Sequence, residues 1–139
     1  MDVTDTQAIL AAFSKAKEVF GRVDVVINNA GWTAASEVES TPDDISRKVF
    51  ETNFWGATNV AKEAVRFFRD ENPSGAGGRL ITISSFVAIK PVVIGGYYSA
   101  SKHGKLHQIC YFIFLNLLGV QPLRPFYRPW QTKWTRNGT

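Results

Sequence analysis

A tyrosine and a lysine spaced four residues apart are the groups in this sequence best suited to acid–base chemistry. Tyr98 and Lys102 enclose the run Ser-Ala-Ser, and residues at i and i+4 share one face of a helix. A neighbouring ammonium favours the phenolate, so Tyr98 is placed to exchange a proton near neutral pH. Tyr97 is the rival tyrosine, but its i+4 partner is Ser101, which carries no charge. Taken alone, such a pair is more often an amphipathic helix face with a solvated lysine.

Three groups of small polar residues precede that pair. They are Asn28-Asn29-Ala30-Gly31 after an apolar run, Asn53 and Gly56 within a helical stretch, and Ser84-Ser85 at the end of a second apolar run. Small residues at the carboxyl end of a strand let a ligand approach the backbone, and open α/β sheets bind ligands there. Each group also has a structural explanation: an Asn-Gly turn, a packing contact or helix kink, and a capping serine.

Helices expected from periodicity and end signals must position these groups. The first runs from Thr4-Asp5 to a stop at Gly21. Its apolar face consists of Ile9, Phe13, Ala16 and Phe20. The second begins at Thr41-Pro42-Asp43-Asp44, with a threonine cap and carboxylates near the positive helix end, and extends to about Glu71. A third begins near Tyr97.

Two β-branched runs supply the strands. Val23–Ile27 is almost unbroken, which is typical of a strand buried on both faces of a parallel sheet. Arg79–Ser84 is the second strand, and Asn72–Gly78 before it has the composition of a loop. The order helix, strand, helix, strand, helix predicts an α/β fold with βαβ crossovers and a parallel sheet.

The overall composition is that of one globular domain. The 139 residues are 45% hydrophobic and 20% charged, which excludes collagen, a long coiled coil and a wholly disordered chain. One cysteine, Cys110, excludes an internal disulfide, and with only two histidines no metal site is expected. The longest apolar run, residues 109–120, is too short to span a bilayer. No secretory signal opens the chain, so we expect a cytoplasmic protein.

In this order, the four groups resemble the short-chain dehydrogenase/reductase family. The resemblance covers Asp2 to His103 and predicts a partial NAD(P)-binding domain over residues 1–103. It implies an incomplete Rossmann-type, doubly wound parallel sheet with flanking helices. It also implies an oxidoreductase that transfers hydride between a nicotinamide cofactor, NAD or NADP, and a small carbonyl or alcohol substrate. A family-type homo-oligomer is expected, without a nucleic-acid partner or a membrane span.

The resemblance assigns a role to each matching residue. Tyr98 would be the general acid/base, and Lys102 would favour its phenolate and hydrogen-bond the nicotinamide ribose. Ser85 would hold the substrate oxygen, and Asn53 would anchor a water in the proton relay. The implied catalytic residues are thus Asn53, Ser85, Tyr98 and Lys102. The implied cofactor-binding residues are Asp2 and Val3 at the adenine, Asn29, Ala30 and Gly31 on the adenosine side, and Tyr98 and Lys102.

Two features depart from the family pattern. The first is the glycine-rich turn that binds the pyrophosphate, which this sequence does not contain. We therefore expect a chain that lacks the first two βα units, roughly 60 residues, and that is weak or inactive alone. The choice between NAD and NADP cannot be read without that part. The alternative is a catalytically inactive fragment that acts through protein–protein association.

The second departure is the tail, residues 104–139. Residues 72–139 carry eight basic residues and no acidic one. The codons that Gly104-Lys105-Leu106 and Gln121 allow fit the two ends of an intron, and the residues that follow fit an out-of-frame exon. The tail is therefore predicted to be a disordered, retained-intron and frameshift sequence. A competing hypothesis, single-strand nucleic-acid or membrane-surface binding, uses Lys105, Arg124, Arg128, Lys133 and Arg136 with interleaved aromatic residues.

Overall fold

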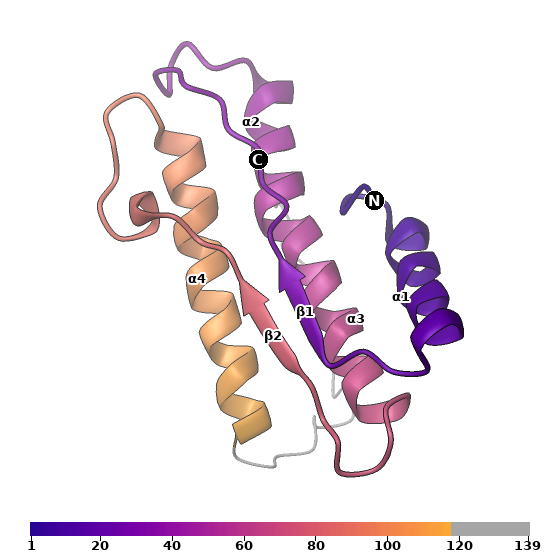
Figure 1. Cartoon of the computed structure of the whole chain (residues 1–139). Coiled ribbons are helices and arrows are strands. Elements are labelled where there is room, and N and C mark those ends of the chain that lie inside the picture. Colours follow the sequence, from indigo (N-terminus) through magenta and orange to yellow (C-terminus); the bar gives the residue numbers. More distant parts are fainter. Residues whose placement is uncertain (118–139) are drawn as a thin grey trace, which may run out of the picture.

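The computed structural model describes residues 1–117, and their side chains up to residue 108 (Figure 1). Along the chain lie α1 (Thr6–Phe20), β1 (Val25–Asn28), α2 (Asp43–Phe50), η1 (Glu51–Gly56), α3 (Ala57–Asp70), β2 (Arg79–Thr82), η2 (Phe86–Ala88) and α4 (Gly96–Leu117). Here η1 is a π-helical turn and η2 a 3₁₀ turn. The expected alternation of helices and strands is confirmed.

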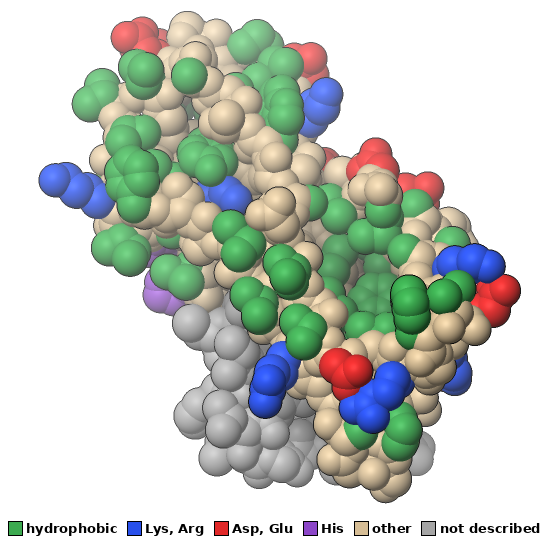
Figure 2. All heavy atoms as spheres, viewed as in Figure 1, with side chains coloured by type: hydrophobic (Ala, Val, Ile, Leu, Met, Phe, Trp, Pro, Cys, Tyr) green, Lys and Arg blue, Asp and Glu red, His purple; other side chains and the backbone are tan. Residues whose placement is uncertain are grey.

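The two strands form a parallel pair with only one covered face. Val25 lies opposite Arg79 and Asn28 opposite Thr82. Helix α3 contacts both strands, whereas hydrophobic side chains gather openly over the other face (Figure 2). The exposed fractions there are 46% for Val25, 63% for Ile27, 47% for Ile81 and 43% for Ile83. The prediction of a strand buried on both faces is therefore wrong: no described helix covers this side.

Helix α1 begins and ends where its sequence signals place it. The Asp5 carboxylate caps the start by accepting the backbone N–H of Gln7 at 2.8 Å and of Ala8 at 3.3 Å. Gly21 ends the helix at φ +75°, a left-handed conformation that glycine adopts without strain, and its N–H donates to the Lys17 carbonyl. Both end signals predicted from the sequence are confirmed.

The hydrophobic core lies between α1, α3 and the strands. Its buried members are Val3, Ile9, Phe13, Val60, Ala64 and Phe67. The rings of Phe13 and Phe67 lie 5.6 Å apart, centroid to centroid, and join the two helices. Phe20, expected on the buried face of α1, is instead 75% exposed. It stands at the last turn of α1, beyond the reach of α3 side chains in the core, so periodicity alone placed it wrongly.

The stretch predicted as one helix to Glu71 is divided into α2, η1 and α3. Thr41 does not cap α2: its hydroxyl donates to the Glu37 carbonyl at 2.7 Å, and the helix has no side-chain cap. The two carboxylates expected in the first turn, Asp43 and Asp44, are there. The interruption at η1 falls on Asn53 and Gly56, which are both poor residues for a helix interior.

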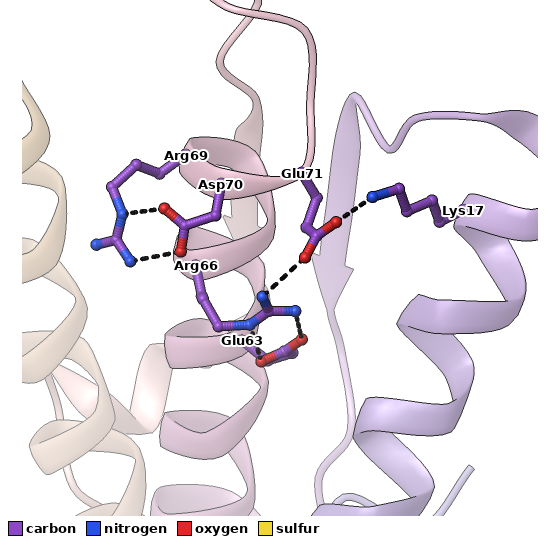
Figure 3. A network of polar contacts seen from close by, with 6 residues as sticks. All are labelled: Lys17, Glu63, Arg66, Arg69, Asp70 and Glu71. Carbon is purple, nitrogen blue, oxygen red and sulfur yellow. Dashed lines mark hydrogen bonds and ion pairs between the residues drawn. The ribbon is translucent and has the colours of Figure 1, made fainter.

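A network of ion pairs ties α1 to the end of α3 (Figure 3). Arg66 holds Glu63 through two hydrogen bonds of 2.9 and 2.7 Å and reaches Glu71 at 3.1 Å. Glu71 also pairs with Lys17 of α1. These charges lie mainly at the surface, on the α1 side of α3.

Helix α4 is longer than the sequence pattern indicated. It begins at Gly96, one residue before the expected start, and continues through residue 117. Residues 104–117, assigned to a disordered tail, thus continue this helix to its end. A break in the family pattern therefore did not mean a break in the helix. Residues 118–139, the rest of that predicted tail, lie outside the described residues.

Candidate functional site

Three of the predicted site residues meet where β1 ends. The chain leaves β1 through Asn29 and Ala30 and reaches Gly31, which lies beside side chains from η1 and α4. A Cβ added at Gly31 would come within 3.0 Å of Lys102 Nζ and 3.4 Å of Asn53 Oδ1. A larger residue would therefore crowd these two groups, so a close approach of side chains, rather than a turn, favours glycine at this position.

Asn53 joins the loop after β1 to helix α4. Its Oδ1 accepts the Trp32 N–H at 2.7 Å, and its Nδ2 donates to the Trp32 carbonyl at 2.7 Å and to Ser101 Oγ at 3.0 Å. The side chain is fully buried. Its π-helical turn is a local device that often marks functional sites. Because the amide is engaged at both ends, its role here is to fix two segments of the site relative to each other.

Gly56 in the same turn serves packing. A Cβ there would come within 2.7 Å of Val3 Cγ2 and 3.0 Å of the Val3 carbonyl oxygen. Its explanation as a packing contact is supported by this geometry. Val3 itself is buried in the core and lies in a turn with Thr4, whereas Asp2 before it is exposed.

Tyr98 and Lys102 share one face of α4, as their spacing predicts. Lys102 Nζ lies 5.6 Å from the centre of the Tyr98 ring. The Ser101 hydroxyl donates to the Tyr98 carbonyl at 2.8 Å while it accepts from Asn53. Asn53, Ser101, Tyr98 and Lys102 therefore belong to one connected group.

Ser85 sits at the start of η2, which packs against α4. Its hydroxyl accepts the Val87 N–H at 3.5 Å, a long bond that leaves the oxygen available to other donors. The side chain of Ser84 has no hydrogen-bond partner among the described residues, although its oxygen is buried. The structure thus places Ser85 after the end of β2, at the start of a turn that contacts α4.

The electrostatics of α4 are dominated by two buried lysines. Burial lowers the pKa of Lys102. Burial and the charge of Lys102 lower the pKa of Lys105 to about 8. Lys105 is fully buried, which removes it from the basic surface that the nucleic-acid hypothesis required. The other basic residues of that hypothesis lie outside the described residues.

At the amino terminus, the Asp2 carboxylate is engaged locally. It accepts the backbone N–H of Thr4 at 2.9 Å and its hydroxyl at 2.8 Å. These bonds hold the pKa of Asp2 below its usual value. Its assignment to the adenine of a cofactor stays a prediction, as does that of Val3.

Comparison with known proteins decides the family. The sequence profile described as short chain dehydrogenase matches residues 1–109. The chain belongs to the short-chain dehydrogenase family. An uncharacterized oxidoreductase of Schizosaccharomyces pombe is 41% identical to it over 102 residues, which make up 73% of this chain and 34% of that protein. The chain thus spans about a third of the length of this curated relative, and about a third of a second one, the oxidoreductase calM of Penicillium decumbens.

Solved short-chain dehydrogenases share the fold of the described residues. A short chain dehydrogenase of Mycobacterium smegmatis superposes with a TM-score of 0.76 at 27% identity, over 85% of this chain and 48% of that one. NAD⁺-bound xylitol dehydrogenase gives 0.74 at 28% identity, over 85% of this chain and 44% of that one. The chain is therefore part of a Rossmann-type α/β domain.

Two residues of this short-chain dehydrogenase site were missed in the sequence. Ser101 was noted only as an uncharged neighbour of Tyr97, although it connects Asn53 to Tyr98. Its position three residues after Tyr98, on the same helical face, was the available signal. Lys105 was read as a surface residue, although it follows Lys102 by three positions on the inner face.

Among the described residues, no cluster of side chains could hold a metal ion, and none of the helices has the length and apolar character that a membrane span needs.

Proposed function

We propose that this chain is part of an NAD(P)-dependent oxidoreductase that interconverts a carbonyl and an alcohol. The observation that supports this most is the convergence of Gly31, Asn53 and Lys102 beside Tyr98, since they come from three separate elements. A structural role for the Tyr-Lys pair alone would not require a glycine to face the lysine ammonium.

A nicotinamide cofactor fits the opening after β1. Glycine at position 31 leaves space that a Cβ would fill, and the Lys102 ammonium faces that space. Lys102 would hold the ribose hydroxyls, and Asn29 and Ala30 would line the adenosine side. Asp2 and Val3 are assigned to the adenine by resemblance. When bound, the cofactor gives or accepts the hydride.

The chain's own residues handle the proton and the substrate oxygen. The Tyr98 hydroxyl donates its proton to the carbonyl oxygen in reduction and takes it back from the alcohol in oxidation. Lys102 lies beside the Tyr98 ring, and the Ser85 hydroxyl would hold the substrate oxygen. Asn53 fixes the loop after β1 against α4 through its side chain, so the relay water assigned to it stays a prediction.

The test compares a whole cofactor with its nicotinamide half. The 139-residue chain is titrated with NADH, NADPH and reduced nicotinamide mononucleotide, and turnover is followed with a panel of aldehydes and ketones. Because this sequence contains no glycine-rich turn, we expect weak binding and slow turnover, with little gain from the second half of NADH. Lys102→Met should weaken binding of all three nucleotides, whereas the exposed Lys90→Met should not.

Tyr98→Phe separates chemistry from binding. It should lower turnover on the order of a hundredfold or more, the contribution of a lost general acid/base, while nucleotide binding persists. Tyr97→Phe is the matched control and should keep the rate. Near-normal turnover by Tyr98→Phe would overturn the role assigned to Tyr98. Nucleotide binding with no measurable turnover in the wild-type chain would favour the inactive alternative.

That alternative, association with another protein, has its own support in the open face of the sheet. Val25, Ile27, Ile81 and Ile83 form an exposed apolar strip. A partner chain that covers the sheet would bury it. Light scattering tests this by comparing the mass of the wild-type chain with that of an Ile27→Ser/Ile81→Ser variant. Association through the strip gives a larger mass for the wild-type chain only, whereas a monomer gives the same mass for both.

A further inference from the structure

Lys105 is an amine buried without a partner in the part of the chain that the structure describes. The residue is 0% exposed, and its Nζ makes no hydrogen bond to any described group. Lys102, three residues earlier on the same helix, is 4% exposed. Residues at i and i+3 are neighbours on a helix surface. The inner face of α4 therefore carries two adjacent ammonium groups withdrawn from water.

The surroundings of Lys105 hold this face firmly in place. A Cβ at Gly104, the preceding residue, would lie 3.3 Å from the Phe54 ring of η1. One turn further, the Thr58 hydroxyl of α3 donates to Gln108 Oε1 at 2.6 Å. These contacts are aromatic or neutral, so they do not compensate a charge.

No acidic group among the described side chains offsets the two charges. Besides η2, which has no ionisable residue, the elements packed against α4 are α2, η1 and α3. Their charged side chains are Asp43, Asp44, Arg47, Lys48, Glu51, Lys62, Glu63, Arg66, Arg69 and Asp70. On α4 itself the titratable neighbours are Tyr97, Tyr98, Lys102, His103 and His107. Of all these groups only Lys102 acts appreciably on Lys105, and it repels.

We propose that Lys105 is a positioning residue that acts through Lys102, and that its protonation loosens the face of α4 that carries the candidate catalytic residues. With Lys105 neutral, Lys102 keeps a single charge beside Tyr98 and Gly31. With both charged, repulsion in a poorly solvated space pushes Lys102 from that position or α4 from η1. The catalytic consequence rests on the proposed function, whereas the coupling between the two lysines does not.

The direction of the pH effect follows from proton linkage. Burial lowers the pKa of Lys105 from 10.5 to about 8 in the folded chain. Between these values the unfolded chain binds a proton that the folded chain has released, so stability rises with pH. The folded-to-unfolded ratio then increases by up to about tenfold per pH unit for this one group. Below about pH 8 both states are protonated, and the cost of the buried charge is fully present.

Two variants fix the charge state in opposite senses. Lys105→Met removes the charge with a side chain of similar length, and Lys105→Arg retains it because arginine does not deprotonate in proteins. Lys62→Met on α3, an exposed lysine, is the matched control. Urea unfolding of the full chain is measured from pH 6.5 to 10, and the lysine side chains are titrated by NMR with ¹³Cε labels.

The proposal expects three results. Lys105→Met is more stable than the wild-type chain at pH 7, and this advantage shrinks as the pH rises. One lysine resonance titrates near pH 8 and is missing from Lys105→Met. In that variant the pKa of Lys102 rises, a shift that a purely structural role of Lys105 would not cause. Should Lys105→Arg fail to fold, the Met variant and the NMR titration still decide the matter.

An unchanged Lys102 titration in Lys105→Met would overturn the proposal, as would a Lys105 resonance that titrates near 10.5. Neither readout needs cofactor or turnover. Absence of nucleotide binding would therefore count against the proposed function and leave the coupling of the two lysines standing. Normal binding with no coupling would do the reverse.

Discussion

The surface between α1 and α3 and the inner face of α4 both gather charged side chains, but only the first pairs them. On the surface, Arg66 holds Glu63 and Glu71, and Glu71 is shared with Lys17 (Figure 3). On α4, Lys102 and Lys105 are buried without an acidic neighbour.

The difference is informative because the region with more ionic contacts has the smaller effect on stability. The region without them carries the larger energetic cost. Exposed ion pairs are screened by water and salt and contribute little each. An uncompensated buried ammonium is costly, and a fold keeps such a group mainly where it has a use or cannot avoid it. Lys102 has a use in the proposed reaction. Lys105 has none of its own, which is why its effect is expected through Lys102.

The largest effect is expected where buried polar groups are fully satisfied. Asn53→Ala removes three hydrogen bonds to Trp32 and Ser101. It also leaves the part-buried N–H and carbonyl of Trp32 without these partners, whereas the Ser101 hydroxyl still donates to Tyr98. We expect a loss of about 3 kcal/mol in the free energy of unfolding, since each orphaned group costs roughly 1–3 kcal/mol less any relaxation. Urea unfolding measures it.

Asn59→Ala on α3 is the control for this variant, because Asn59 is half-buried and its side chain makes no hydrogen bond to a described residue. A loss for Asn53→Ala no larger than for Asn59→Ala would mean that the buried network adds nothing to stability. The buried hydrogen bonds of Asn53 could then no longer serve as the standard against which the two charged regions are compared.

Local signals predicted both ends of α1, because such signals act over a few residues. The Asp5 cap and the Gly21 stop depend only on backbone groups within one turn, so the sequence contains everything they need. The alternation of patterns also predicted the order of the elements. The family resemblance predicted the grouping of Asn53, Tyr98 and Lys102.

What the sequence did not reveal depends on which surfaces meet. The burial of Lys105 follows from how α4 lies against η1, and the exposure of Phe20, Val25 and Ile27 follows from the absence of a described neighbour. An apolar pattern indicates a face that can be covered. It contains no information on whether a partner is there to cover that face. Nor did the sequence indicate that the Ser101 hydroxyl would accept a hydrogen bond from the Asn53 amide.

The second prediction concerns the surface network, and it removes Arg66 at the centre of that network. Arg66→Met breaks the contacts with Glu63 and Glu71, and the Glu63 side chain is only 10% exposed. We expect a loss of about 2 kcal/mol, made up of weak surface pairing and one carboxylate left poorly solvated. Arg69→Met, whose partner Asp70 is its exposed sequence neighbour, should cost less than about 0.5 kcal/mol.

The network also predicts how the free energy of unfolding changes at acidic pH. Lys17 and then Arg66 hold the pKa of Glu71 below its ordinary value of 4.5. Its contribution is therefore complete above that value and is lost as the pH falls through the lowered pKa. The stability difference between Arg66→Met and the wild-type chain should shrink in unfolding experiments carried out below about pH 4. A difference that grows on acidification would contradict this assignment.

The smallest effect belongs to the most exposed pair, Lys15 and Glu18 on α1. Their charged atoms are 3.0 Å apart, but the side chains are 66% and 68% exposed. Water competes for both groups, and holding two long side chains costs rotamer entropy. Lys15→Met should therefore change the free energy of unfolding by no more than about 0.3 kcal/mol, and 0.5 M salt should erase even that difference. A loss above about 1 kcal/mol would show that exposed pairing stabilises this chain as strongly as buried bonding. The distinction between its two charged regions would then rest on function alone.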